Sequence, residues 1–418
     1  MIRNEDKVQY NMRIILVFIT CLCIKVRAFS SGPIDTQATP ETKHLYNNLL
    51  ALTRNTQTIL FGHHHDTLTG AGGGRNPYRT TNHNGTKGWT FTSHQVHIKS
   101  PDDLSDVKSV TGEYPAVIGF DIGHLDNLDR ARYLIRRAAN RGLIITISWH
   151  QSNPISDSPS AYVSDDHTGV DIHRAIHQIL PHGNSTLHSK FTVALDKVAA
   201  FIISLKDSSG HTIPVIFRPY HEMNGAWFWW GTNSKTGNTP YDYKMLFQFV
   251  VKYLKNTKQV HNIIYAYSPG KSLHDYLKFY PGDSHIDLLG LDFYFTRPFD
   301  PPLTEFQKLV NVLTDVGHNR NKIAALTEVG MKNSGIDSHP NFWSDHVLVS
   351  LKNGNGTTQL CYMLTWANRC SSNSCDVQVP YQGHPASSNF FNHFYKDPLI
   401  RFGNFTNHTG PSLSQIVG

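Results

Sequence analysis

The 418-residue sequence has no apolar run long enough for a comfortable membrane span, which needs about 20 apolar residues. The apolar run near the amino terminus, Ile14–Ile24, is shorter than that. It follows Arg13 and precedes Val26-Arg27-Ala28, which fits the small-residue rule for cleavage by signal peptidase. We therefore expect residues 1–28 to be a secretion signal and the mature protein to be extracellular.

Five Asn-X-Ser/Thr sequons support passage through an endoplasmic reticulum, where such asparagines accept glycans. They lie at Asn84, Asn184, Asn355, Asn404 and Asn407. One such match is often accidental, but five of them behind a leader indicate a secreted glycoprotein. The leader itself can begin at Met1 or at Met12, because residues 1–11 are mostly polar.

The excess of positive over negative charge is also small. The chain has 38 Lys and Arg residues against 32 Asp and Glu residues, and residues 1–28 hold five and two of these. The mature chain therefore has 33 against 30, a net charge of about +3. So weak a field does not indicate a nucleic acid or a membrane surface as partner, whereas a neutral polysaccharide is compatible with it. We expect the mature protein to be a monomer.

Cysteine is rare, with five residues in the chain. Cys21 and Cys23 lie in the leader, which leaves Cys361, Cys370 and Cys375 in the mature protein. The last two are close enough in sequence to form a small disulfide loop in an oxidising compartment, while Cys361 lies in an apolar run and is expected to be a buried thiol. These three residues do not have the spacing of zinc ligands.

No proline- or serine-rich linker divides the chain, and no repeat of solenoid or propeller length is present. Short apolar runs instead alternate with helical patterns, which is the signature of repeated strand-helix units and a parallel sheet. Eight such runs predict a single (β/α)8 TIM barrel, an α/β fold. They are Ile59–Phe61, Ala116–Phe120, Leu143–Ser148, Val215–Phe217, Ile263–Tyr267, Ile286–Leu291, Ile323–Thr327 and Leu360–Leu364.

The expected helices are Glu41–Asn55, Asp126–Arg141, Ser189–Leu205, Tyr243–Lys255 and Thr304–Thr314. We expect an amino-terminal segment at residues 29–41, the barrel at 42–400 and a carboxyl-terminal tail at 401–418. The chemistry of such a barrel sits at the carboxyl ends of its strands. The polar or aromatic residues that follow the eight runs are His63, Asp121, His150, Glu222, Ser268, Asp292, Glu328 and Trp366.

The most informative stretch runs from Arg218 to Gly231. An apolar run leads into it, and Glu222 is followed closely by Trp227-Phe228-Trp229-Trp230. Flat indole faces beside a carboxylate suit the stacking of sugar rings near a proton donor. Four consecutive aromatic residues cannot all face one core, so we expect some of them to line a cleft.

A second glutamate, Glu328, ends the apolar run that begins at Ile323 and precedes Gly330. Hydrolysis of a glycosidic bond needs two carboxyl groups, one that protonates the leaving oxygen and one that attacks or activates water. We therefore expect Glu222 and Glu328 to lie at neighbouring strand ends and to supply both groups.

At these residues the chain resembles the family 26 glycoside hydrolases, whose best-known members are endo-β-1,4-mannanases. The resemblance rests on the Arg218–Gly231 segment with Glu328, and it covers roughly residues 42 to 400. Five further motifs match in the right order: Phe61-Gly62-His63 with Asp66, Gly119-Phe120-Asp121, Ser148-Trp149-His150, Asp292-Phe293-Tyr294 and Thr365-Trp366.

The two glutamates receive distinct predicted roles. Glu222 is the candidate acid/base, with a pKa raised by apolar surroundings such as Trp227 and by the charge of Glu328. Glu328 is the candidate nucleophile, held in its ionised form by hydrogen bonds from Tyr294 and Arg218. The resemblance implies a retaining double displacement.

The resemblance also implies a set of substrate contacts. The predicted substrate-binding residues are His150, His221, Arg218, Trp227, Asp292, Tyr294 and Trp366. His150 and His221 would bind sugar hydroxyls or orient a glutamate, and Trp366 would form the floor under the sugar at the cleavage point. Many relatives have an arginine directly after this tryptophan, whereas here Ala367 and Asn368 precede Arg369. This departure affects the predicted binding of the sugar one position further from the cleavage point.

The expected function is therefore a secreted endo-β-1,4-mannanase that cleaves mannan, glucomannan or galactomannan without a cofactor or metal. A β-1,3-xylanase and a mixed-linkage β-glucanase share the glutamate pair and stay open as alternatives, as does a catalytically silent carbohydrate-binding barrel. The segment His63-His64-His65-Asp66 is the rival signal of a metal-dependent hydrolase. Such a site also needs histidines after the middle strands, where Ser268 and Asp292 stand instead.

Overall fold

The computed structural model describes residues 32–403, apart from 56, 73–77, 82–89, 94–103, 124–127, 233–234, 273–274, 297–301, 333–334, 355–358 and 371–373. Several predicted features lie outside the described residues. They are the secretion signal, the tail after residue 403, and the sequons at Asn84, Asn355, Asn404 and Asn407.

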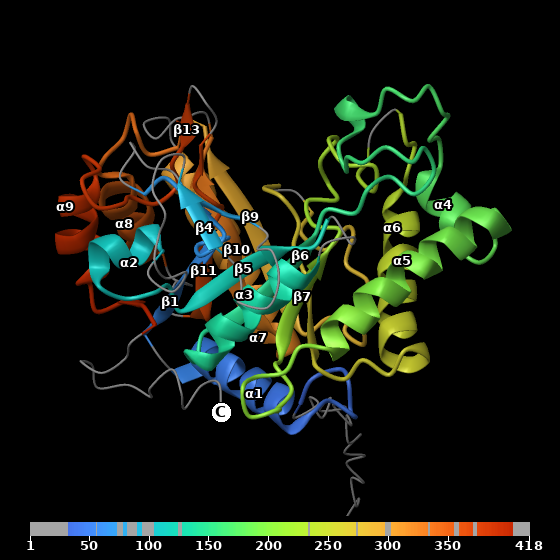
Figure 1. Ribbon diagram of the computed structural model, residues 1–418, viewed down its shortest axis with the longest axis horizontal. Helices are drawn as coiled ribbons and strands as arrows, with labels where there is room; N and C mark the ends of the chain where they lie inside the picture. The colour runs from blue at the N-terminus through green and yellow to red at the C-terminus, as the bar shows by residue number, and fades with distance from the viewer. Residues whose placement is uncertain are drawn as a thin grey trace, which may run out of the picture.

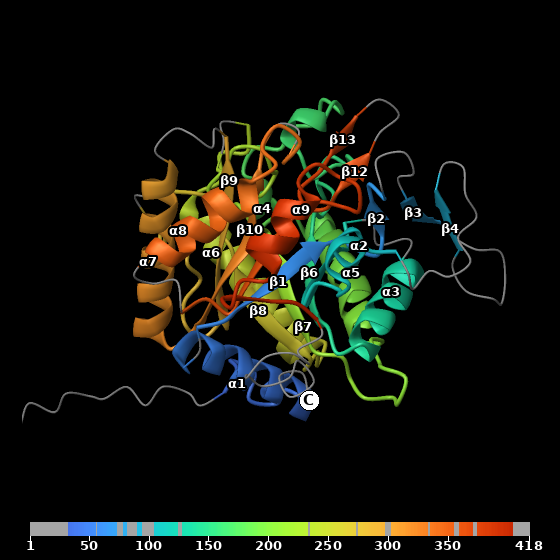
Figure 2. The same cartoon turned by 90° about the vertical axis from the view of Figure 1, so that its left-hand side faces the viewer.

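The core is a closed barrel of parallel strands surrounded by helices (Figures 1 and 2). Within the described residues the strand order is β11-β10-β9-β8-β7-β6-β5-β1, and β11 pairs with β1 to close the ring. The strands are β1 (Ile59–His64), β5 (Val117–Asp121), β6 (Ile144–Trp149), β7 (Val215–Pro219), β8 (Ile263–Tyr267), β9 (Leu288–Phe295), β10 (Ile323–Met331) and β11 (Tyr362–Thr365). All eight predicted runs are therefore confirmed as barrel strands.

These strands form because their side chains are apolar on both faces. One face fills the barrel interior and the other packs under the surrounding helices, so a parallel strand reads as a continuous apolar run. β6, β7 and β8 are buried along their whole length. A short strand, β14 (Ile400–Arg401), extends the sheet beside the start of β1, so the barrel reaches one residue into the predicted tail.

The helices cover the outside of the barrel (Figure 1). They are α1 (Pro40–Asn55), α2 (Asp106–Thr111), α3 (Leu128–Asn140), α4 (Ala175–Ile179), α5 (Ser185–Ile203), α6 (Pro240–Lys252), α7 (Pro302–Arg320), α8 (Val349–Asn353) and α9 (Ser387–Asn389). Single π-helical segments are η3 (Tyr253–Thr257), η4 (Phe342–Leu348) and η6 (Phe390–Tyr395). In the part of the chain described, no helix has the length and apolar character that crossing a bilayer requires.

Local capping fixes two of these helices. Asn184 accepts hydrogen bonds from the backbone N–H groups of Thr186 and Leu187, which explains why α5 begins at Ser185, earlier than predicted. Thr239 and Asp242 form a capping box at the start of α6.

The amino-terminal segment is tied to the bottom of the barrel. The backbone N–H of Ile34 donates to Asp287 at 2.7 Å, and Asp35 contacts His261 at 2.8 Å. Both partners lie just before strands β9 and β8, at the end of the barrel opposite to the strand carboxyl ends.

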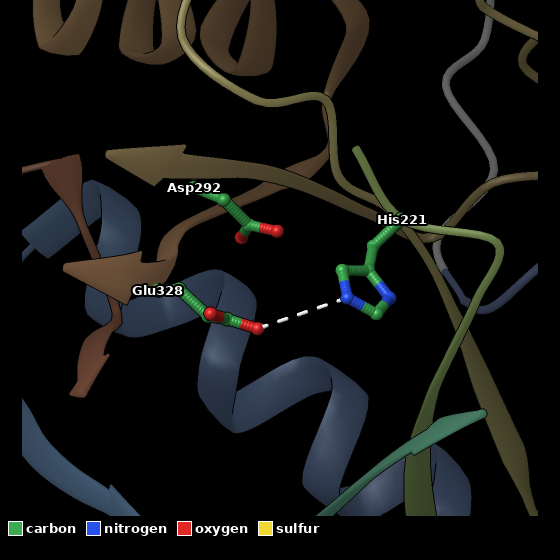
Figure 3. Close-up of side chains that lie close together, drawn as sticks. All are labelled: His221, Asp292 and Glu328. Carbon is green, nitrogen blue, oxygen red and sulfur yellow. Dashed lines mark ion pairs between the residues drawn. The ribbon is translucent and has the colours of Figure 1, made fainter. Parts of the chain in front are cut away.

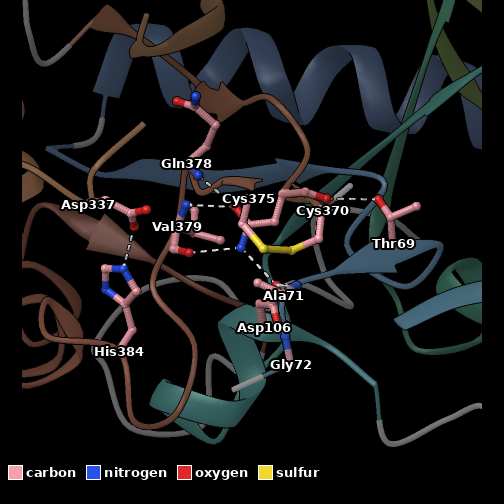
Figure 4. Close-up of a disulfide and its surroundings, with 11 residues drawn as sticks. Thr69, Ala71, Gly72, Asp106, Asp337, Cys370, Cys375, Gln378, Val379 and His384 are labelled. Carbon is pink, nitrogen blue, oxygen red and sulfur yellow. Dashed lines mark hydrogen bonds and ion pairs between the residues drawn. A yellow bond between two sulfur atoms is a disulfide. The ribbon is translucent and has the colours of Figure 1, made fainter. Parts of the chain in front are cut away.

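A disulfide joins Cys370 and Cys375 across a small hairpin of β12 (Arg369–Cys370) and β13 (Cys375–Asp376), as predicted (Figure 4). Asn368, just before this hairpin, donates to the carboxylate of Asp106 at 2.8 Å and anchors it to the barrel mouth. Cys361 is a free, buried thiol, which is also as predicted. A further small sheet contains β2 (Thr69–Gly70), β3 (Tyr78–Thr81) and β4 (Thr90–Ser93).

Candidate active site

A strained turn after β7 presents Glu222 to the barrel mouth. Tyr220 and Glu222 both adopt left-handed backbone conformations, with φ of 52° and 53°. Such conformations are uncommon for residues other than glycine and concentrate at functional sites. The turn is held by the backbone N–H of Glu222, which donates to the carbonyl of Ser268 at 2.8 Å. Glu222 therefore stands three residues beyond its strand, in a fixed place.

The aromatic run after Glu222 divides between core and cleft. Phe228, Trp229 and Trp230 are buried, whereas Trp227 is 40% exposed. The indole N–H of Trp227 donates to Oε2 of Glu222 at 2.8 Å. Its ring lies directly against Gly225, where an added Cβ would come within 2.4 Å of ring atoms. The predicted split of this run between core and surface is thus what the structure contains, with Trp227 as the cleft residue.

Glu222 is set up to hold a proton. Burial raises its pKa well above the usual range, and the charges of Asp292 and Glu328 raise it further. The charge of Arg218 and the hydrogen bond from Trp227 oppose these effects without cancelling them. A carboxylic acid kept protonated in this way suits a proton donor.

Glu328 lies on β10 and is held from two sides. Oε1 accepts a hydrogen bond from Nη2 of Arg218 at 2.5 Å, and Oε2 accepts one from the hydroxyl of Tyr294 at 2.5 Å. Burial raises the pKa of Tyr294 well above its ordinary value, so its hydroxyl keeps the proton that it donates. Two donors on one carboxylate suit an anionic nucleophile, because an ionised carboxylate only accepts hydrogen bonds.

The two glutamates are not on neighbouring strands, contrary to the prediction. β7 and β10 are separated by β8 and β9 in the sheet order. Closure of the barrel nevertheless brings both groups to one mouth, since His221, the residue before Glu222, has Nε2 4.0 Å from Oε1 of Glu328. The linear sequence shows strand ends but not which strands face each other across a closed sheet.

Arg218 and Asp292 lie beneath the glutamates. Arg218 is buried and donates through Nη1 to Oδ2 of Asp292 at 2.8 Å, as well as to Glu328. Burial lowers the pKa of Arg218, but the charges of Asp292 and Glu328 outweigh it and raise that pKa. The other oxygen of Asp292 accepts from the hydroxyls of Ser268 and Thr327, at 2.7 and 2.8 Å.

A β-bulge explains how Thr327 and Glu328 can both reach this cluster. The pairing of β10 with β9 shifts between Leu326 and Glu328, so Thr327 is an extra residue on its strand. Glu328 then lies opposite Asp292. Without this bulge, the alternation of side chains along a strand would turn Glu328 to the other face.

His221, Asp292 and Glu328 form the compact group drawn in Figure 3, with ligand atoms within 4.8 Å of one another. This is a geometry that a metal ion could use. However, Arg218 already donates to both carboxylates, and its guanidinium carries the positive charge that a metal would bring. Burial and the charge of Arg218 lower the pKa of His221 well below its usual value, so His221 is neutral.

The rival metal motif at the end of β1 is engaged in internal contacts. Nδ1 of His63 pairs with Asp66 at 2.7 Å, and both side chains are fully buried. His64 stacks on Trp366 with ring centroids 4.1 Å apart and contacts the Ser148 hydroxyl at 3.2 Å. The histidine run therefore contributes a packing contact, through His64, to Trp366, the residue predicted to lie under the sugar at the cleavage point.

His150 and Trp366 complete the mouth. Nδ1 of His150 contacts Asp121 at 2.6 Å, and its ring meets those of His221 and Trp366 edge-on at 4.5 and 5.6 Å. The guanidinium of Arg369 lies over Trp366, 5.3 Å from the ring centre. The arginine displaced along the sequence is thus still next to this tryptophan.

Of the predicted substrate-binding residues, four retain side-chain surface at the mouth: His150, Trp227, Tyr294 and Trp366. Arg218, His221 and Asp292 are at most 2% exposed, and the contacts of Arg218 and Asp292 are with the residues that hold Glu328. Sugar contact by these three stays a prediction, and the geometry assigns Arg218 and Asp292 a positioning role.

Two residues with clear positions were missed from the sequence. Asp121 stood in a matched motif without a role, and it proves to bind His150. Lys332, four residues after Glu328, has its ammonium 5.8 Å from the centre of the Trp227 ring. The available signal was its even spacing from Glu328: residues an even number of positions apart on a strand share a face, and Lys332 directly follows β10.

The fold and the paired glutamates at the carboxyl ends of its strands define the class, a (β/α)8-barrel glycoside hydrolase. The chain belongs to glycosyl hydrolase family 26, whose model matches residues 34–352.

Similar proteins carry mannanase names. The chain is 35% identical over 301 residues to a mannan endo-1,4-beta-mannosidase of Bifidobacterium adolescentis, and the match covers 65% of this chain and 28% of that protein. It is 26% identical over 337 residues to that of Bacillus subtilis strain 168, covering 77% and 80%. The chain therefore spans about a quarter of the first relative, and most of the second.

Solved structures agree. The GH26 beta-mannanase BoMan26A from Bacteroides ovatus superposes with a TM-score of 0.70 at 32% identity, covering 87% of this chain and 95% of that one. An endo-beta-1,4-mannanase from Cellulomonas fimi gives 0.72 at 29% identity, covering 89% and 77%.

Proposed function

We propose that the protein is a secreted endo-β-1,4-mannanase that hydrolyses β-1,4-mannosidic bonds in mannan, glucomannan and galactomannan with retention of configuration. The observation that carries the proposal is the pairing of a Glu222 whose pKa is raised with a Glu328 held by Arg218 and Tyr294. The names of its relatives favour mannan as the substrate.

The first step is attack by Glu328. One of its oxygens bonds to the anomeric carbon while Glu222 donates its proton to the departing glycosidic oxygen, and a covalent glycosyl-enzyme forms. Glu328 loses its negative charge when it bonds to the anomeric carbon, and Glu222 becomes ionised as the glycosidic oxygen departs with its proton, so the hydrogen bonds from Arg218 and Tyr294 to Glu328 weaken. They also restrain the carboxylate so that it is aligned before attack.

The second step reverses these roles. Glu222, now ionised, takes a proton from water, and the oxygen of that water attacks the anomeric carbon and releases Glu328. Trp227 keeps Glu222 directed into the mouth in both steps through its indole N–H. The exposed ring of Trp227 and the partly exposed ring of Trp366 suit contact with sugar rings.

The test is release of reducing sugar from glucomannan, galactomannan, β-1,3-xylan and barley β-glucan by the purified mature protein. We expect activity on the two mannans, a ladder of oligosaccharides that marks internal cutting, and the β-anomer as the first product by NMR. Glu328→Ala and Glu222→Ala should each remove the activity, and Glu41→Ala, on α1 outside the mouth, should not. Activity confined to the xylan or the β-glucan would overturn the substrate, and binding without cleavage would overturn the enzymatic function.

Secretion of the protein and its monomeric state are part of the same proposal. The leader at residues 1–28 and the sequons support secretion, and Asn184 is accessible at the amino end of α5. Size-exclusion chromatography of the secreted protein with and without endoglycosidase would test glycosylation and the proposed monomeric state together.

A further inference from the structure

Asp121 is a partly buried carboxylate at the carboxyl end of β5, and it accepts hydrogen bonds from residues at the end of the next strand, β6. Oδ2 accepts from Nδ1 of His150 at 2.6 Å, from the Ser148 hydroxyl at 2.8 Å and from the backbone N–H of His150 at 3.2 Å. Oδ1 accepts from the backbone N–H of Gly123 at 2.8 Å. All four partners are donors, so the arrangement calls for an ionised aspartate.

The charge balance agrees with this arrangement. Burial by itself would raise the pKa of Asp121, but His150, through a positive charge when it is protonated and through its hydrogen bond, and the hydrogen bond from Ser148 lower it below the usual range. The carboxylate therefore stays ionised, and because an ionised carboxylate can only accept hydrogen bonds, its 2.6 Å contact with Nδ1 of His150 calls for Nδ1 as the donor.

The other ring nitrogen of His150, Nε2, is available at the barrel mouth. The side chain is 17% exposed, and its neighbours are the rings of Tyr162, His221, Phe228 and Trp366. Among the described residues no hydrogen-bond partner is found for Nε2. In a neutral imidazole with its proton on Nδ1, Nε2 is an acceptor.

We propose that Asp121 is a positioning residue that fixes the tautomer and the ring orientation of His150, so that Nε2 accepts a hydrogen bond from a sugar hydroxyl. The inference rests on the proposed function for its substrate class, a sugar with a hydroxyl at the cleavage site. It adds a second polar pair, Asp121 and His150, to the two glutamates. This pair lies at the ends of β5 and β6, across the barrel mouth from β10.

Asparagine cannot replace Asp121 in this role, although its shape is the same. The amide has one acceptor oxygen and one NH2 group, and the carboxylate accepts donors at both oxygens. In either orientation the NH2 group of a substituted asparagine would face at least one N–H donor, from Gly123 or from His150. The variant Asp121→Asn preserves volume and weakens the preference for a proton on Nδ1: an NH2 group turned toward His150 reverses it, and an amide oxygen turned toward His150 accepts that proton without the carboxylate's charge.

The first experiment reads the tautomer directly and needs no substrate. Histidines of the full mature chain are labelled with 15N, and the His150 signals are assigned from their loss in His150→Gln. We expect a protonated Nδ1 and a pyridine-like Nε2 in the wild type, and a shift toward protonated Nε2 in Asp121→Asn. The same tautomer in both proteins would overturn the proposal.

The second experiment is a double-mutant cycle on whichever polysaccharide the enzyme cleaves. Asp121→Asn should lower kcat/KM by up to about tenfold, the size expected for loss of one hydrogen bond between uncharged groups. If Asp121 acts through His150, adding Asp121→Asn to His150→Ala should cause no further loss. Additive losses would mean that Asp121 only supports the fold, and would overturn the proposal.

The matched control is Asp35→Asn. Asp35 also contacts a histidine, His261, at 2.8 Å, but at the opposite end of the barrel. The substitution Asp35→Asn should lower the melting temperature without changing kcat/KM. If no polysaccharide is cleaved by any variant, the proposed function fails, and the NMR comparison still decides the tautomer.

Discussion

The exposed ring of Trp227 and the carboxyl of Glu222 are joined by a hydrogen bond of 2.8 Å from the indole N–H to Oε2. One residue therefore offers a flat face to a sugar and orients the group that would protonate the glycosidic oxygen. In the proposed mechanism this bond would couple stacking to proton transfer, because movement of the ring would also move the carboxyl group of Glu222. The ammonium of Lys332 lies 5.8 Å from the centre of the same ring.

Replacement of Trp227 by Phe tests this coupling. Phe keeps an aromatic face but has no N–H donor, and the hydrogen bond from Trp227 lowers the pKa of Glu222. Its loss should raise that pKa. Because the acid form of Glu222 is the active one, activity falls as pH rises through its pKa, so the basic limb of the pH–rate profile should move to higher pH. A profile of kcat/KM measures the shift, and an unchanged basic limb would contradict the role of the indole N–H.

Tyr294→Phe should separate positioning of the nucleophile from folding. It removes the hydroxyl that donates to Oε2 of Glu328 at 2.5 Å and leaves the ring in place. We expect kcat to fall by about 10- to 100-fold, the cost of a charge-assisted hydrogen bond of about 1.5–3 kcal/mol. Steady-state kinetics on mannan and thermal melting give the two readouts.

The control for that change is Tyr253→Phe. Tyr253 also donates to a carboxylate, that of Asp196 at 2.7 Å, but on the outer helices. Equal kinetic losses in both variants would show that the effect at Tyr294 is not specific to the site.

Arg218→Met should destabilise the fold more than any change at the surface. Arg218 is the buried cation between Asp292 and Glu328, and its loss leaves two carboxylates buried side by side. Removing one partner of a buried ion pair costs about 3–5 kcal/mol. Burial already raises the pKa of Asp292, and Arg218 opposes this, so the variant should raise that pKa further and its stability should recover as pH falls. Urea denaturation at pH 5 and pH 8 measures this, and an equal loss at both pH values would argue against it.

The barrel could be predicted from the sequence because strands buried on both faces appear as short apolar runs, as in Val215–Pro219. The candidate pair of glutamates could be identified because Glu328 ends the apolar part of its run and Glu222 follows its run within a few residues. The bulge between Leu326 and Glu328 could not, because it depends on register with β9. The same is true of the contact between Asp121 and His150, which are 29 residues apart and meet only when β5 pairs with β6.

The split of the Trp227–Trp230 run was predicted from the pattern of aromatic residues, and Trp227 was named as its substrate-binding member only through the family resemblance. The side chain that remains exposed is set by the turn at Glu222, whose positive φ no pattern of apolar residues reports. Burial of Arg218 and Asp292 beneath the mouth was likewise hidden, since charged residues at strand ends read as cleft residues until their mutual contact is known.

Asp287, at the bottom of the barrel, gives a prediction for stability that does not involve the active site. It is fully buried, and its oxygens accept from the backbone N–H groups of Ile34 and Tyr265. Burial raises its pKa to about 6, although these hydrogen bonds oppose the shift. The folded chain therefore holds a proton on Asp287 at pH values where the unfolded chain has lost it, which favours folding at low pH.

This contribution is fully present below the ordinary pKa of aspartate and is lost as pH rises through about 6. Asp287→Asn has no such dependence. The variant should therefore be destabilised more at pH 4 than at pH 8, by about 3 kcal/mol for a shift of about two pKa units. Urea titration of both proteins at the two pH values measures the difference. A variant that loses the same stability at both, or more at pH 8, would show that Asp287 is ionised in the folded protein throughout this range.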